Sequence, residues 1–131
     1  MIVLDTHILL WWVSGSTRLP GRARRAIAGA LRAGPAIASA ISLFEIATAA
    51  RRGRVDLGLS LVDWFAEIHR IAELKVEPVS AEIARIAGGF ADPMPRDPAD
   101  RIIAATAIAL ETKLLTADQR LRRSPQLQTV W

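Results

Sequence analysis

The opening residues restrict the fold of this chain more than any other stretch. Residues 2–4 read Ile-Val-Leu, an apolar run that is typical of a central parallel strand covered by helices on both faces. Asp5 and Thr6 follow at once, so we expect the strand to end at Asp5. Because the carboxyl ends of strands in open parallel sheets face the ligand site, Asp5 is a candidate functional group. Capping of a short helix over residues 6–13 explains the same residue equally well.

Length and composition limit what such a group can do. With 131 residues and 51% hydrophobic content, the chain is expected to form a single domain over residues 1–131. The sequence has no cysteine, which excludes disulfides, thiolate zinc sites and cysteine nucleophiles and fits a reducing cytoplasm. A metal ion would therefore be held by oxygen atoms or by the two histidines. The start has no basic segment and no 18-residue apolar stretch occurs, so neither secretion nor membrane insertion is expected.

The net charge of +4 is unevenly distributed along the chain. Residues 1–55 contain eight arginines and only two acids, whereas residues 56–131 contain nine lysines or arginines and eleven acids. The first half is therefore strongly basic. A polyanionic partner and ordinary solubility both explain this surplus, and charge alone favours solubility.

Strand-like and helix-like segments alternate through the rest of the chain. Four further short strands are expected near residues 36–38, 76–79, 114–116 and 128–131, separated by helices near residues 20–33, 40–52, 60–72, 80–89 and 98–110. Pro78 restricts its strand to a sheet edge or to a strand end. The alternation predicts a parallel α/β sheet.

Glu45 is a charged residue within a helix that is otherwise apolar nearly all round. It is the only acid between Asp5 and Asp56, and its neighbours predict that the helix is buried. A buried carboxylate is unfavourable unless it is paired or bound to a cation. Glu45 is therefore either a functional group or one partner of an internal salt bridge to an arginine.

Two acids mark the start of the helix near residues 98–110. Asp97 is well placed as the N-cap, Pro98 suits the first helical position, and Asp100 then falls in the first turn. Asp100 shares a face with Ile103 and Ala107, so its carboxylate is expected to point inward. We therefore assign Asp100 to the site and Asp97 to the cap.

Residues 114–118 repeat the pattern of the first strand. The sequence Leu-Leu-Thr-Ala-Asp places Asp118 at a second strand end, just after the hydroxyl of Thr116. Asp5, Glu45, Asp100 and Asp118 are then expected at one edge of the sheet, where their charges repel one another unless a cation neutralises them. Carboxylate oxygens suit Mg²⁺ or Mn²⁺ better than zinc.

These motifs, in this order, resemble the PIN-domain ribonucleases. The resemblance rests on residues 3–11 (Val-Leu-Asp-Thr-His-Ile-Leu-Leu-Trp), the helix of Glu45, residues 96–101 (Arg-Asp-Pro-Ala-Asp-Arg) and residues 115–118 (Leu-Thr-Ala-Asp), and it extends to about Leu121. More narrowly, the chain is similar to the VapC-type toxins of bacterial toxin–antitoxin pairs. The resemblance implies a three-layer α/β/α PIN-like fold whose parallel sheet has strand order 3-2-1-4-5.

The resemblance also implies an activity and a set of site residues. It implies metal-assisted hydrolysis of structured RNA, such as tRNA or rRNA, with Mg²⁺ or Mn²⁺ held by the four acids. The implied partners are a VapB-type antitoxin, a second copy of the chain in a homodimer, and RNA. Thr116 and Thr6 are expected to support the site. Candidate contacts to RNA are Arg22, Arg24, Arg25 and His7.

Two other classes of protein share part of this sequence pattern. An aspartyl-phosphate phosphotransferase also begins with an acid after its first strand, but such enzymes have Asp-x-Asp where this chain has His7. The second class is a catalytically inactive PIN-like binding module that sequesters a protein or an RNA. Retention of all four acids argues against it, and a metal titration would decide.

Overall fold

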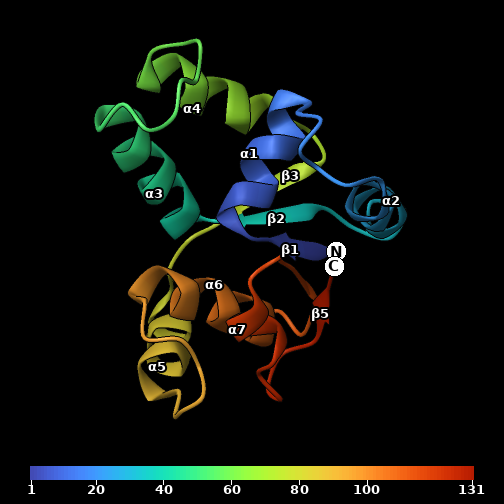
Figure 1. The fold of residues 1–131 in the computed structure, drawn as a ribbon, viewed down its shortest axis with the longest axis vertical. Coiled ribbons are helices and arrows are strands. Elements are labelled where there is room, and N and C mark those ends of the chain that lie inside the picture. Colours follow the sequence, from blue (N-terminus) through green and yellow to red (C-terminus); the bar gives the residue numbers. More distant parts are fainter.

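The computed structural model describes residues 1–131 and contains one five-stranded sheet (Figure 1). All paired strands are parallel and their order is β3-β2-β1-β4-β5, as predicted. The strands are β1 (Ile2–Leu4), β2 (Ala36–Ser39), β3 (Leu74–Glu77), β4 (Leu114–Leu115) and β5 (Thr129–Val130).

Seven helices connect and cover these strands. They are α1 (Thr6–Ser14), α2 (Gly21–Ala30), α3 (Ala40–Arg51), α4 (Leu61–Arg70), α5 (Ala81–Gly89), α6 (Pro98–Ala109) and α7 (Gln119–Arg122). None of them combines the length and the hydropathy that crossing a bilayer requires.

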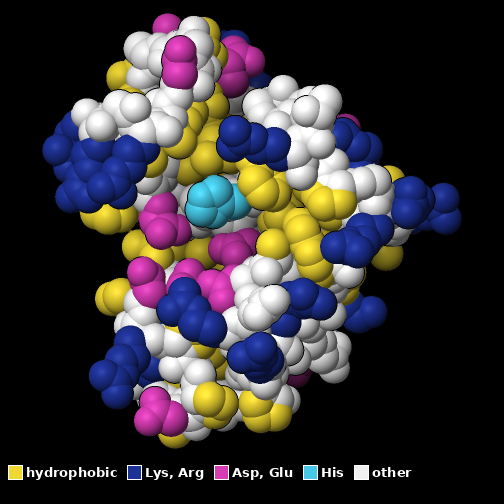
Figure 2. All heavy atoms as spheres, viewed as in Figure 1, with side chains coloured by type: hydrophobic (Ala, Val, Ile, Leu, Met, Phe, Trp, Pro, Cys, Tyr) yellow, Lys and Arg dark blue, Asp and Glu magenta, His cyan; other side chains and the backbone are white.

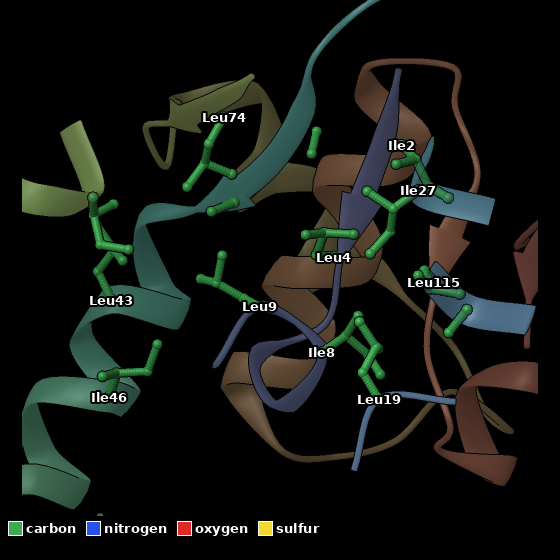
Figure 3. Packing of buried hydrophobic residues seen from close by; sticks show 14 of the residues in the cluster. Ile2, Leu4, Ile8, Leu9, Leu19, Ile27, Leu43, Ile46, Leu74 and Leu115 are labelled. Atoms are coloured by element: carbon green, nitrogen blue, oxygen red, sulfur yellow. The ribbon is translucent and has the colours of Figure 1, made fainter. Parts of the chain in front are cut away.

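The side chains of β1 alternate between the two faces of the sheet and so divide the core. Ile2 and Leu4 pack into a larger apolar cluster with side chains of α1, α2, α3 and α4, part of which is seen from close by in Figure 3. Val3 packs on the opposite face against Ile103 of α6 and its neighbours. The molecule therefore has three layers, and β1 is fully enclosed as its apolar sequence predicts.

Serine and aspartate side chains cap the starts of several helices. The hydroxyls of Ser39, Ser60 and Ser80 each accept a backbone amide of the first helical turn. Asp97 caps α6 and Pro98 is its first residue, as predicted. At the other end of α1, Gly15 has φ +66°, a left-handed conformation that glycine adopts without strain.

Three expectations about individual elements need correction. Helix α3 is not buried all round, because Phe44 is 66% exposed while only one side of the helix faces the core. Helix α2 ends at Ala30 rather than near Ala33, and residues 31–33 form turns. Strand β3 lies two residues earlier than predicted, so that Pro78 falls just after its end, where it interrupts no sheet hydrogen bond.

Candidate active site

The four acids singled out by the sequence lie at the carboxyl edge of the sheet. Asp5 follows β1, Asp118 follows β4, Glu45 lies on the helix that continues from β2, and Asp100 lies in the first turn of α6. Figure 2 shows acidic side chains gathered in the middle of the corresponding face. The predicted convergence therefore has a clear structural origin, which is the parallel sheet.

Asp5 is held at both of its carboxylate oxygens. Its Oδ1 accepts the amide of Thr6 at 2.8 Å, and its Oδ2 accepts the hydroxyl of Thr116 at 2.6 Å. The Thr116 hydroxyl in turn accepts the amide of Asp118 at 3.0 Å. Asp5 caps α1 and Asp118 caps α7, and both also lie among the acids of the candidate site. Each residue therefore fits the two interpretations that the sequence allowed. Thr116 is fully buried and joins two of the acids.

Glu45 is oriented by a second threonine. The Thr6 hydroxyl lies 2.6 Å from Oε1 of Glu45 and 2.9 Å from the hydroxyl of Ser42. Because Thr6 has a single hydroxyl proton and a charged carboxylate is the stronger acceptor, the Thr6 proton is donated to Glu45. No lysine or arginine lies within ion-pair distance of Glu45, so the predicted alternative of an internal salt bridge is wrong.

The environment of these acids opposes their full ionisation. Burial is the main cause that raises the pKa of Asp100 to about 7, and the charges of Asp97, Asp5, Asp118 and Glu45 add to the effect. Burial also raises the pKa of Glu45, although the hydrogen bond from Thr6 opposes this rise. Excess negative charge is therefore concentrated at this edge.

Asp97 contributes to this charge, although the sequence indicated only a cap. It does cap α6, since its Oδ1 accepts the amides of Ala99 at 2.8 Å and Asp100 at 3.2 Å. Its charge is also the largest charge effect that raises the pKa of Asp100 and of Glu45. Asp97 is thus both a cap and an electrostatic member of the site.

Arg120 is the only basic residue paired with the acids. Its Nη2 lies 3.2 Å from Oδ2 of Asp118 and 3.6 Å from Oδ2 of Asp100. Burial alone would raise the pKa of Asp118, but the side-chain and backbone hydrogen bonds from Arg120 outweigh it and lower that pKa. The guanidinium therefore stabilises the ionised form of Asp118.

The donor set fits a hard divalent cation. Carboxylate oxygens are the ligands that Mg²⁺ and Mn²⁺ prefer. A cation would also neutralise the charges of the neighbouring acids, which add to burial in raising the pKa of Asp100. As the side chains stand, no three acidic or histidine residues lie close enough to share one ion. Binding an ion through three or more of these residues would require side-chain rearrangement.

The candidate RNA contacts belong to two helices, with His7 on α1 and the three arginines on α2. His7 is exposed, its ring lies 6.1 Å from that of Trp11, and its charge lowers the pKa of Glu45. Arg22 stacks on the ring of Trp131 at 5.3 Å, beyond the end of β5. Arg24 donates to the carbonyl of Ser16. Arg25, like Arg22 and Arg24, is exposed on α2.

Sequence reasoning missed three contributors to the site, each for a different reason. Ser42 lies three residues before Glu45 on one face of α3, a spacing that was available as a signal. The capping pattern explains Asp97 fully and so conceals its second role. Arg120 had no sequence signal beyond its place two residues after Asp118, because the length and direction of its side chain decide which acids it reaches.

The sequence of the chain matches a known protein family and a known relative. The PIN domain family matches residues 2–126. Ribonuclease VapC22 of Mycobacterium tuberculosis is 35% identical over 133 residues, which cover 99% of this chain and 98% of that protein.

Solved structures show the same fold at lower identity. DNA-bound VapBC from Salmonella typhimurium matches with a TM-score of 0.70 at 19% identity, covering 98% of this chain and 96% of the matched chain. VapBC-1 from nontypeable Haemophilus influenzae matches with a TM-score of 0.68 at 22% identity, covering 99% and 97%. The chain therefore belongs to the PIN-domain family, and its similarity to VapC22 over nearly its full length places it among the VapC-type members.

Proposed function

We propose that this chain is a metal-dependent ribonuclease that acts as the toxin of a toxin–antitoxin pair. The observation that carries the proposal is the convergence of Asp5, Glu45, Asp100 and Asp118 on one sheet edge, where the pKa of Asp100 is raised to about 7. Such crowding of acids lowers stability unless it serves to bind a cation. The name of the relative VapC22, a ribonuclease, supports the same activity.

The four acids would hold Mg²⁺ or Mn²⁺. A bound divalent ion would supply activation of water and neutralise charge that develops on the phosphate oxygens. The chain itself supplies orientation. Thr116 fixes Oδ2 of Asp5, and Thr6 fixes Oε1 of Glu45, so that each acid is held by a hydroxyl from a different segment. Fixed donors of this kind reduce the reorganisation needed when substrate binds.

The substrate that we propose is a structured RNA, such as tRNA or rRNA, whose cleavage stops translation and growth. The carboxylate site is open on one face of the molecule, with lysine and arginine side chains flanking the acids (Figure 2). Basic side chains around the acids favour an anionic backbone. A single-stranded loop presents that backbone without the obstruction of a duplex.

Substitution of single acids tests this activity. Asp5→Asn and Asp100→Asn should each abolish cleavage of structured RNA in Mg²⁺. Asp100→Asn should not lower the melting temperature in EDTA, because it removes one of several repelling charges. Asp5→Asn also removes the acceptor of one hydrogen bond, from Thr116 or from Thr6, so its melting temperature should fall slightly while the protein stays folded. Asp63→Asn, at an exposed position on α4, is the matched control and should cleave normally. If both site variants still cleave at the wild-type rate, the catalytic site lies elsewhere. If the wild-type chain itself does not cleave RNA in Mg²⁺, it is a PIN-like binding module.

A groove beside the acids supports the antitoxin part of the proposal. It has a volume of about 750 Å³ and lies between α1, the connection from α3 to α4, and α4. Its apolar lining includes Leu10, Trp11, Val55, Leu57, Trp64 and Ile68, and His7 also lines it. Hydrophobic side chains are visible in this hollow above the acids in Figure 2. Nine of the sixteen lining residues are apolar, and apolar side chains grouped in an open groove are typical of a protein-binding surface.

The partner that we propose for this groove is an apolar segment of a VapB-type antitoxin. Similar solved structures include VapBC proteins, among them a DNA-bound VapBC from Salmonella typhimurium, which supports an antitoxin of this kind. We also propose a homodimer within a larger toxin–antitoxin assembly. Co-expression with the small protein encoded next to this chain should give one complex on a sizing column, with RNA cleavage suppressed. Separate elution at micromolar concentration would contradict the pairing.

A further inference from the structure

Arg120 occupies a place among the acids that the resemblance to PIN-domain proteins does not assign. Its side chain lies across Asp118, with Nε 3.5 Å from Oδ1 and Nη2 3.2 Å from Oδ2, and Nη2 also reaches Oδ2 of Asp100 at 3.6 Å. One nitrogen therefore bridges two acids from different elements. The guanidinium of Arg120 is thus a cation that Asp100 and Asp118 share.

The backbone explains why the guanidinium lies there. The amide of Arg120 donates to Oδ1 of Asp118 at 2.8 Å and thereby begins α7. This bond fixes the backbone of Arg120 next to the Asp118 carboxylate. The Arg120 side chain therefore has to fix few further torsion angles to lie across that carboxylate. Arg122 on the same helix has an exposed side chain that pairs with no acid. The bridging is thus particular to position 120.

The contact is nevertheless easy to break. The Arg120 side chain is 64% exposed, whereas those of Asp100 and Asp118 are 19% and 24% exposed. Solvent screens the ion pairs of an exposed guanidinium, so these contacts contribute little to stability. The guanidinium can therefore leave the acids without disturbing the core, while α6 and the start of α7 keep the backbone of Asp100 and Asp118 in place.

We propose that Arg120 is an internal counter-cation that competes with the divalent ion for the oxygens of Asp100 and Asp118. It pairs with these acids in the metal-free protein and leaves them when the ion binds. The physical reason is that the same carboxylate oxygens cannot point both at the guanidinium and at an ion. Arg120 therefore weakens metal binding while it reduces repulsion in the metal-free state. This inference rests on the proposed metal site.

Direct titration of Mn²⁺ into the protein by calorimetry tests this competition without reference to cleavage. Arg120→Gln should bind Mn²⁺ about two- to fivefold more tightly than Arg122→Gln, which removes the same charge from the same helix without touching an acid. Arg120→Gln should also melt at a lower temperature than Arg122→Gln in EDTA, and saturating Mn²⁺ should reduce this difference.

The possible outcomes separate the two proposals. If wild type binds Mn²⁺ and Arg120→Gln binds it no more tightly than Arg122→Gln, the competition is overturned while the metal site stands. Weaker binding by Arg120→Gln would likewise overturn it, because the arginine would then support the ion. If no variant binds Mn²⁺, both the metal site and the competition are wrong. The melts in EDTA establish that each variant is folded.

Discussion

The hydroxyl of Thr116 donates a 2.6 Å hydrogen bond to Oδ2 of Asp5, a residue 111 positions away in the sequence. The bond crosses from the end of β4 to the end of β1, which are adjacent in the sheet. Thr6 makes the equivalent contact to Glu45 on α3. Two threonines therefore align acids from three segments, and the site is more ordered than a set of repelling carboxylates would be alone.

Removal of the Thr116 hydroxyl should disturb the site more than the fold. In Thr116→Val, Asp5 loses a donor and the amide of Asp118 loses its acceptor. A hydrogen bond to a charged group contributes about 1.5–3 kcal/mol, so RNA cleavage should fall about tenfold or more. Thr116→Ser keeps the hydroxyl and should retain most activity. Thr112→Val removes a hydroxyl that bonds only the Met1 carbonyl, and normal cleavage by that variant is the control.

The stability of the metal-free protein should depend on pH through Asp100. Burial and neighbouring charges raise its pKa from 3.8 to about 7, so between these values the folded state holds a proton that the unfolded state has released. The free energy of unfolding in EDTA should therefore fall by a few kcal/mol as pH rises from about 4 to about 7, and then level off.

Asp100→Asn isolates this effect. Asn does not titrate, so the variant should not lose this stability as pH rises. Asp100→Asn should therefore become increasingly more stable than wild type over the same pH range. Asp118 has a lowered pKa, so its contribution is lost only as pH falls below about 4, outside this window. Urea unfolding at several pH values is the measurement. Parallel curves for wild type and Asp100→Asn would contradict the raised pKa.

Arg101 should be essential for the loop that precedes α6. Its guanidinium donates to the carbonyls of Ala87 at 2.9 Å, Phe90 at 2.7 Å and Pro95 at 3.1 Å. A lysine cannot reproduce this planar arrangement, so Arg101→Lys should lower the free energy of unfolding by about 3 kcal/mol. Arg85→Lys, on the exposed side of α5, should change it little. Equal urea midpoints for the two variants would show that the three bonds contribute nothing measurable.

Local sequence patterns were sufficient to predict the parallel sheet and the acids at its carboxyl edge. The Ile-Val-Leu run at residues 2–4 and the acid that follows it indicate a buried strand with a functional carboxyl end, and the structure confirms the buried strand and the acid at its end. The same reasoning placed Asp118, whereas Asp100 was placed by the helix start at Pro98 and by the helix face that it shares with Ile103. Such predictions succeed because a parallel sheet brings its carboxyl ends together whatever the details of packing.

Contacts between segments that are distant in the sequence could not be predicted from local patterns. The sequence around Phe44 is apolar on every side, yet only the tertiary arrangement decides which side of α3 faces the core. The pairing of Arg120 with Asp100 depends on where α7 lies relative to α6. The double role of Asp97 as cap and as charge has the same origin.

The arginines of α2 are expected to bind RNA phosphates. Replacing Arg22, Arg24 and Arg25 with Gln should weaken RNA binding and flatten its salt dependence, by about 0.7 in the log–log slope for each phosphate that is no longer neutralised. Mn²⁺ affinity should not change. A control in which Arg70, Arg85 and Lys113 become Gln removes equal charge elsewhere. Equal slopes for the two triple variants would show that α2 is only a solvated surface.

The dependence of RNA cleavage on added divalent ion tests the central claim most directly. Wild-type protein should be dialysed against EDTA, then assayed on a structured RNA over a range of Mg²⁺ or Mn²⁺ concentrations, with Asp5→Asn in parallel to exclude a contaminating nuclease. We predict no cleavage in EDTA, saturable recovery with either ion, and no recovery by Asp5→Asn. Cleavage at an unchanged rate in EDTA, or equal recovery by Asp5→Asn, would contradict a metal-dependent ribonuclease built on these four acids.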